Sequence, residues 1–196
     1  RKVIGLIGLI NYYKGILTMH EVARHMETEP YYFVFLGSNN VVDGDLSINE
    51  IKRYFKQYPL SNCFCHFEFI PDSEFWSALQ TFDLIWAAFE NFHQLNECYP
   101  WSSNTISNAA YCNKPIIVSE GGLMGYRVEQ YNLGLSIKPG SSLDAYLKIK
   151  SHFEGKAKTT FGFEKYKRLN SISTMNDMFY KLLKDRHILK DRVTRH

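Results

Sequence analysis

Lys14 is the first residue whose type and position suggest chemistry. It stands in the segment Gly8–Gly15, between an apolar run and a helical pattern. An ammonium group directly before a helix can pair with a phosphate as a point charge, although the same position suits a solvated surface lysine. The spacing of the glycines does not match a dinucleotide fingerprint, and no Walker sequence occurs. The usual nicotinamide and P-loop nucleotide sites are therefore disfavoured.

Ser102, Ser103 and Asn104 form a second candidate site. They precede the helical run Thr105–Cys112. The first turn of a helix has unpaired N–H groups and the positive end of the helix dipole, so it can hold a phosphate. The spacing alone favours an ordinary N-cap, because Ser and Asn are common capping residues.

Metal chemistry has little support in the sequence. Cys63, Cys65 and His66 are close together, but their spacing matches no zinc pattern, and the two cysteines would share one face of a strand. The Asp-Gly-Asp segment at residues 43–45 has the form of an Asp-x-Asp metal motif, yet Asp and Gly favour turns for local backbone reasons. We expect no metal site and reduced thiols.

Six short apolar runs predict strands that are buried on both faces of a sheet. They are Val3–Leu9, Tyr31–Leu36, Phe64–Ile70, Leu84–Ala88, Pro115–Ser119 and Gly134–Ile137. Helical patterns separate them, with Ser47, Asp72 or Ser73, and Ser142 as expected N-caps. This alternation predicts a doubly wound parallel α/β sheet. Such sheets bind ligands at the carboxyl ends of their strands.

Composition and charge limit the class of protein. The 196 residues are 45% hydrophobic and 22% charged, as in a globular protein. Residues 164–196 contain nine Lys or Arg and four Asp or Glu. The rest of the chain has a net charge of −2, which does not suggest nucleic-acid binding. We expect one domain over residues 1–160 and a helical tail over 161–196. The basic tail is either a solvated helix face or a contact with anionic lipid.

Short motifs follow one another in a distinctive order over residues 2–150. The strand VIGLIGLI precedes Lys14-Gly15, the second strand ends as YYFVFLG, and FEFIPDSEFWSALQTFDLIWAA places Asp83 before an apolar strand. The series ends with Ser102-Ser103-Asn104, KPIIV at 114–118, Gly-Gly at 121–122 and Asn-Leu-Gly at 132–134. In this order the motifs resemble the carboxyl-terminal half of GT-B-fold glycosyltransferases, especially family 4, the glycosyl transferases group 1, whose fold is Rossmann-like.

The resemblance implies a nucleotide-sugar donor of the UDP or GDP type. The resemblance also implies that an amino-terminal domain, expected to be missing here, would bind the acceptor sugar or lipid-linked glycan. Lys14 would contact the donor diphosphate, and the helix start at 102–104 would hold it with N–H groups. These positive groups would stabilise the leaving group without a metal. The loops after Gly37 and Ile70 would surround the base.

The acidic residues depart from the family pattern. Its E-x7-E pair is absent, because Asn108 stands at the second glutamate, which typically holds the donor ribose, and Pro100 lies near the first. An amide can still hydrogen-bond a ribose hydroxyl, more weakly than a carboxylate. Glu90, His93 and Glu97 are candidates to replace the missing acid, but we expect exposed loop residues. The implied binding residues are Gly8, Lys14, Gly37, Ser38, Ile70, Pro71, Ser102, Ser103, Asn104 and Asn108, with Lys14 also catalytic.

The expected function is the donor-binding half of a glycosyltransferase in glycan or polysaccharide synthesis. The chain alone would be inactive. Two alternatives stay open: a non-catalytic nucleotide-sugar-binding module, which the missing acids favour, and an epimerase of the same fold. We expect a cytoplasmic location, either free or peripheral at the inner membrane surface.

Overall fold

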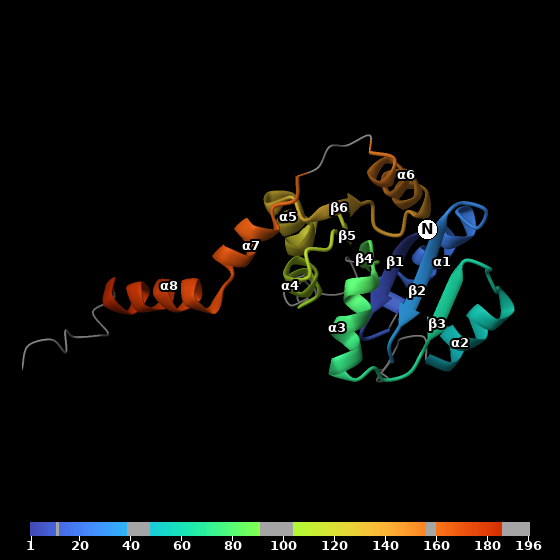
Figure 1. Ribbon diagram of the computed structural model, residues 1–196, viewed down its shortest axis with the longest axis horizontal. Helices are drawn as coiled ribbons and strands as arrows, with labels where there is room; N and C mark the ends of the chain where they lie inside the picture. Colours follow the sequence, from blue (N-terminus) through green and yellow to red (C-terminus); the bar gives the residue numbers. More distant parts are fainter. Residues whose placement is uncertain (11, 39–47, 91–103, 156–159, 186–196) are drawn as a thin grey trace, which may run out of the picture.

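The protein is a parallel sheet with helices on both faces, as a computed structural model shows (Figure 1). The structure describes residues 1–10, 12–38, 48–90, 104–155 and 160–185. Six strands pair in the order β3-β2-β1-β4-β5-β6, and every pair is parallel. The chain order reverses between β1 and β4, which makes this the topological switch point of the sheet. The doubly wound fold is therefore confirmed.

The element bounds follow the predicted alternation closely. The strands are β1 (Lys2–Ile7), β2 (Tyr31–Leu36), β3 (Cys63–His66), β4 (Leu84–Ala87), β5 (Ile116–Ser119) and β6 (Gly134–Ile137). The helices are α1 (Ile16–His25), α2 (Ile48–Gln57), α3 (Asp72–Thr81), α4 (Asn104–Tyr111), α5 (Gly122–Tyr131), α6 (Ser142–Phe153), α7 (Phe163–Leu169) and α8 (Ile172–Asp185), with a 3-10 turn η1 (Tyr12–Lys14) before α1.

Alternate residues of the central strands pack in two separate hydrophobic cores, one on each face of the sheet. Leu84 and Trp86 of β4 pack in the core beneath α1, α2 and α6, whereas Ile85 and Ala87 pack in the core beneath α3, α4 and α5. Figure 1 shows these two groups of helices on opposite faces of the sheet. All four side chains are buried, as expected for a strand covered on both faces, because successive side chains point in opposite directions.

The edge strand β3 departs from the prediction in length and burial. Its pairing with β2 ends at Leu36 and His66, because β2 itself ends there, so the expected strand Phe64–Ile70 was too long. It was also expected to be buried on both faces, yet Phe64 is 50% exposed. The reason is that β3 is the last strand of the sheet, and none of the described helices buries Phe64.

Two predicted helix caps were wrong by one or two positions. Pro71 occupies the N-cap position of α3, where neither Asp72 nor Ser73 caps with its side chain. At the start of α6, Ser141 and not Ser142 is the cap, and its hydroxyl accepts a hydrogen bond from the Asp144 N–H at 3.2 Å. The third expected cap, Ser47, lies outside the described residues.

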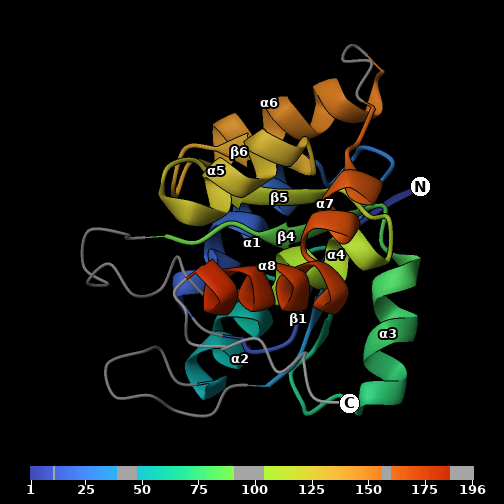
Figure 2. The ribbon, with the colours of Figure 1, turned by 90° about the vertical axis from the view of Figure 1, so that its left-hand side faces the viewer.

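The two last helices differ in how they join the body. Tyr166 of α7 is 1% exposed, and its hydroxyl is 3.1 Å from the Ser107 hydroxyl of α4. Helix α8 projects away from the sheet (Figure 1), and its stripe of Ile172, Met175, Phe179 and Leu182 is exposed. Figure 2 shows α7 beside α4, with α8 continuing beyond it. The helical tail is thus present, while the domain boundary at residue 160 stays a prediction.

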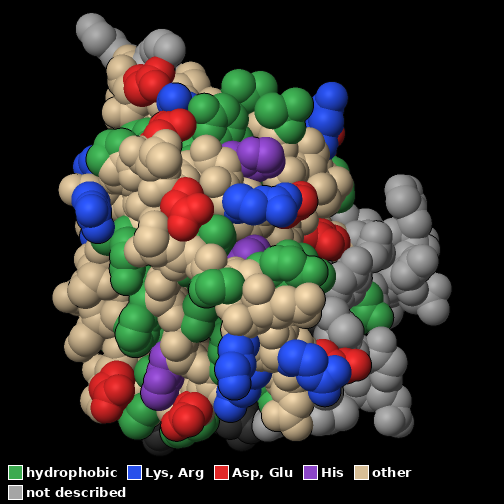
Figure 3. Space-filling model, turned by 90° about the vertical axis from the view of Figure 1, so that its right-hand side faces the viewer, with side chains coloured by type: hydrophobic (Ala, Val, Ile, Leu, Met, Phe, Trp, Pro, Cys, Tyr) green, Lys and Arg blue, Asp and Glu red, His purple; other side chains and the backbone are tan. Residues whose placement is uncertain are grey.

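The surface carries charges of both signs. On the face that includes α1 and α2, basic and acidic side chains are interspersed (Figure 3).

Among the described helices, none is long and apolar enough to cross a membrane.

Candidate functional site

The carboxyl ends of β1 and β2 bring three predicted site residues together. Gly37 has φ +135°, and a Cβ atom there would be 1.7 Å from the Gly8 carbonyl oxygen. The Nζ atom of Lys14 is 4.0 Å from the place where a Cβ atom on Gly8 would stand. Residue 37 must therefore be glycine, and the Lys14 ammonium lies over the end of β1.

Backbone hydrogen bonds tie the neighbouring loops into one edge. The Ile10 N–H donates to the Ser38 carbonyl at 2.9 Å, and the Gly37 N–H donates to the His66 carbonyl at 3.0 Å. The loops after β1, β2 and β3 are thus linked in series. Ser38, another predicted site residue, is held in position through its backbone.

The Lys14 turn is fixed at the switch point between β1 and β4. The indole Nε1 of Trp86 donates to the Lys14 carbonyl at 3.2 Å, and the Glu90 N–H donates to the Tyr13 carbonyl at 2.8 Å. Burial lowers the pKa of Lys14 to about 8. The ammonium group therefore loses its proton at a lower pH than an exposed lysine does.

Glu90 is buried, which corrects the expectation that it is an exposed loop residue. It is 9% exposed, and its carboxylate accepts a hydrogen bond from the hydroxyl of Thr18, in the first turn of α1. Burial raises the pKa of Glu90, and the Thr18 contacts partly oppose that shift. Since Gly15 offers no side chain to cap α1, Glu90 serves as the cap from another part of the chain. His93 and Glu97 lie outside the described residues.

Gly15 permits this close packing. It has φ +61°, and a Cβ atom on it would be 2.4 Å from the Ala88 carbonyl oxygen and 3.3 Å from Oε1 of Glu90. The start of α1 is therefore filled by an acidic side chain of the protein itself. A carboxylate at this position disfavours a second anion at the α1 start.

Ile70 and Pro71 lie after β3 at the start of α3. Ile70 is partly buried and packs against the core on the α3 side, while Pro71 is exposed. The first turn of α3 contains Asp72 and Glu74. Because these carboxylates repel a phosphate, the loop suits a base or a sugar better than a diphosphate.

Helix α4 carries the remaining candidates. Asn104 is its first residue and is exposed, and Asn108 lies one turn further along and is partly buried. No acidic residue stands in the first turn, so the positive end of the helix dipole is not neutralised from within the helix. Ser102 and Ser103 lie outside the described residues.

Sequence reasoning missed two residues that hold the site together. Trp86 was counted only as part of an apolar strand, and Thr18 fell inside a helical pattern. One signal was available for Glu90, because it directly follows the apolar residues Ala88 and Phe89. An acid next to a buried run needs a partner if the chain carries it into the interior.

The described residues contain no group of three or more His, Cys, Asp or Glu side chains that could hold a metal ion. Cys63 and Cys65 share one face of β3, as expected from their spacing. Both thiols are free, and burial raises the pKa of each to about 12.

Comparison with solved structures decides which fold this is. HepE from Anabaena, solved in complex with UDP-glucose, matches with a TM-score of 0.70 and 17% identity over 93% of this chain and 48% of that one. The carboxyl-terminal domain of a glycosyl transferase group 1 protein (LpcC) from Francisella tularensis matches with a TM-score of 0.60 and 17% identity, over 79% of this chain and 76% of that domain. A glycosyltransferase from Rickettsia africae matches with a TM-score of 0.68 and 15% identity, over 97% and 48%.

This is the fold of the carboxyl-terminal half of GT-B glycosyltransferases. The chain spans about half the length of HepE and of the Rickettsia enzyme, at 48% of each. The sequence matches no protein-family model, and no curated protein is significantly similar to it. The structural resemblance expected from the order of motifs is therefore confirmed at the level of the fold.

Proposed function

We propose that this chain is the nucleotide-sugar-binding half of a glycosyltransferase. The observation that carries the proposal is the position of Lys14. It lies over the end of β1, at the switch point of the sheet, where doubly wound folds bind their ligands. HepE, which has the same fold, was solved with UDP-glucose. On this proposal the donor diphosphate lies between Lys14 and the start of α4.

The filled start of α1 supports this assignment. Glu90 caps α1, whereas the first turn of α4 contains no acidic residue and can accept a phosphate. The Lys14 ammonium and the α4 dipole then face the negative charge that develops on the leaving nucleoside diphosphate. On this proposal Gly8 lies beside Lys14, and Gly37, Ser38, Ile70 and Pro71 lie near the base. Asn108 contacts the ribose, and Ser102, Ser103 and Asn104 hold the phosphates.

The chemistry proposed is transfer of the sugar without a metal cofactor, in glycan or polysaccharide synthesis. A second domain would bring the acceptor sugar or lipid-linked glycan to the donor, and proximity supplies much of such catalysis. We therefore expect the 196 residues by themselves to bind the donor without transferring its sugar. Contact between the basic tail and an anionic membrane surface, and a cytoplasmic location, stay predictions.

The test is thermal and urea unfolding in the presence of UDP, GDP and ADP. A ligand at about 100 times its dissociation constant should add ~2.7 kcal/mol to the free energy of unfolding. We expect one nucleoside diphosphate to stabilise the chain and the matching nucleoside to stabilise it far less. If none of the three does so at millimolar concentration, the chain is not a donor-binding half.

A binding module without catalysis is the second candidate. The amide of Asn108, in place of the family's acid, favours it. Both candidates bind the nucleotide, so sugar transfer by the complete protein distinguishes them. An epimerase of this fold would instead convert the nucleotide sugar without an acceptor.

A further inference from the structure

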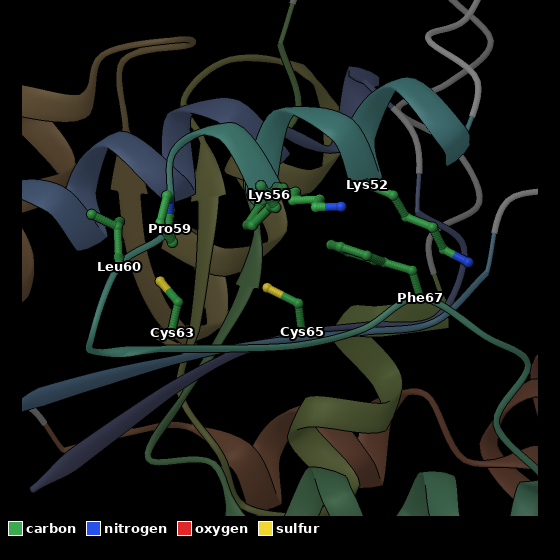
Figure 4. Close-up of a pocket in the computed structure, with 8 residues that line it drawn as sticks. Lys52, Lys56, Pro59, Leu60, Cys63, Cys65 and Phe67 are labelled. Carbon is green, nitrogen blue, oxygen red and sulfur yellow. The ribbon is translucent and has the colours of Figure 1, made fainter.

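A groove separates helix α2 from the edge strand β3, away from the residues proposed to bind the donor diphosphate. Its volume is about 330 Å³, within the range of small-molecule sites, and its walls include Phe55, Leu60 and Phe67. Figure 4 shows Cys63 and Cys65 pointing from β3 toward α2, so they form the floor. The groove exists because these two side chains are small and leave space beneath the helix.

The floor of the groove is neutral. Burial raises the pKa of Cys63 and of Cys65 to about 12, so both thiols keep their protons at physiological pH. Glu27 is the acid whose charge acts on Cys63, and its carboxylate accepts hydrogen bonds from the N–H and the hydroxyl of Ser61, at 2.9 and 3.0 Å. An anion in the groove therefore meets no charged thiolate.

Two cations line the groove from above. Lys52 and Lys56 are one helical turn apart on α2, and both side chains extend toward the end of the groove where Phe67 lies (Figure 4). Neither forms an ion pair with a described residue, although other lysines of the described chain, such as Lys148 and Lys150, do. The groove thus combines an apolar interior with two ammonium groups at one end.

We propose that this groove binds an amphipathic anion, with the apolar body against Phe55, Leu60 and the thiols and the anionic head on Lys52 and Lys56. A short acyl chain with a carboxylate or phosphate head has this chemistry. The groove shares no residue with the set proposed for the nucleotide, so we expect the two ligands to bind independently.

The test compares three ten-carbon probes below their micelle concentrations. Decanoate and decyl phosphate carry the required charge, while decyltrimethylammonium has the same chain and the opposite charge. Binding to the full chain is measured by calorimetry, and the site is located from amide chemical shifts. We expect an anionic probe to bind at least about tenfold more tightly than the cation, with shifts at residues 52–67.

Three variants locate the binding. Lys52→Glu with Lys56→Glu should weaken the anionic probe by about tenfold or more, while Lys181→Glu on α8 is the matched surface control. Cys65→Phe should fill the groove and abolish binding, with its fold checked by cooperative thermal unfolding. Cys65→Ser, which is nearly isosteric, should fold and still bind the anionic probe. This control shows that a loss of probe binding in Cys65→Phe comes from filling the groove with the larger side chain.

Four results would overturn the proposal. They are equal binding of anionic and cationic probes, no effect of the double charge reversal, displacement of the probe by UDP, and no binding of either anion at millimolar concentration. In the last case the lysines serve another purpose, such as keeping a foreign strand off the open edge of β3.

Discussion

At the scale of single residues, Lys14 is the proposed anchor of the phosphates. We predict that Lys14→Ala weakens binding of a nucleoside diphosphate by about 1.5–3 kcal/mol, because a charge-assisted hydrogen bond is lost. Binding of the nucleoside should change little. Calorimetry with both ligands measures the difference, and Lys181→Ala serves as a matched control. Equal losses for the two ligands would show that Lys14 does not contact the phosphates.

The lowered pKa of Lys14 predicts a pH dependence of binding. Burial sets that pKa at about 8 in the free protein, and a bound diphosphate favours the protonated form. Affinity should therefore be highest below pH 8 and should fall as the pH rises through 8 to 9. The same titration on Lys14→Ala should be flat over this interval. A fall of the same size in the variant would assign the pH dependence to another group.

Asn108 is predicted to recognise the ribose. Asn108→Leu should reduce the preference for UDP over 2′-deoxy-UDP by about 0.5–1.5 kcal/mol, the worth of one neutral hydrogen bond. Asn108→Glu should keep or strengthen that preference. Asn176→Leu on α8 is the control for the same change at an exposed site. An unchanged preference in Asn108→Leu would leave α4 as a phosphate site without ribose recognition.

At the scale of elements, Glu90 links the start of α1 to the end of β4. Its raised pKa means that the folded protein binds a proton more tightly than the unfolded chain does. The stability from this group is therefore complete below pH 4.5, its ordinary pKa, and is lost as the pH rises through the folded value.

We predict that Glu90→Gln, which removes the charge and keeps the shape, is more stable than the natural chain at pH 7. The gain should vanish toward pH 4. Urea unfolding between pH 4 and 8 measures both. A less stable variant at pH 7 would mean that the α1 dipole and the Thr18 contacts outweigh the cost of burying the carboxylate.

The sequence predicted the elements better than the contacts between them. Apolar runs such as Leu84–Ala88 located the strands, because a strand buried on both faces needs an uninterrupted run of apolar residues. The length of β3 was beyond such reasoning, since it depends on where its neighbour β2 ends. The same limit explains Glu90. Its partner, Thr18, is 72 residues away in the chain, and local patterns carry no information on such pairs.

At the scale of the whole molecule, α7 belongs to the body and α8 does not contribute to its core. We predict that a chain ending at residue 171 keeps its free energy of unfolding. A chain ending at residue 160 should lose at least about 3 kcal/mol, because it removes the buried aromatic side chain of Tyr166. Urea unfolding of the two truncated chains decides this. Similar stabilities would place the domain boundary at 160.

The contact between Gly8 and Gly37 has a consequence for engineering. Each glycine has a positive φ, which other residues rarely adopt, in a loop that faces the proposed donor, and a Cβ at residue 37 would collide with the other loop. The neighbouring Leu9 is 39% exposed, and the backbone carbonyl of Ser38 accepts the hydrogen bond that ties it to Ile10. A mutagenesis library that seeks a different sugar nucleotide can therefore vary residues 9 and 38 freely. It should hold 8 and 37 constant, since a side chain at either position would change the path of the loops that present the new side chains.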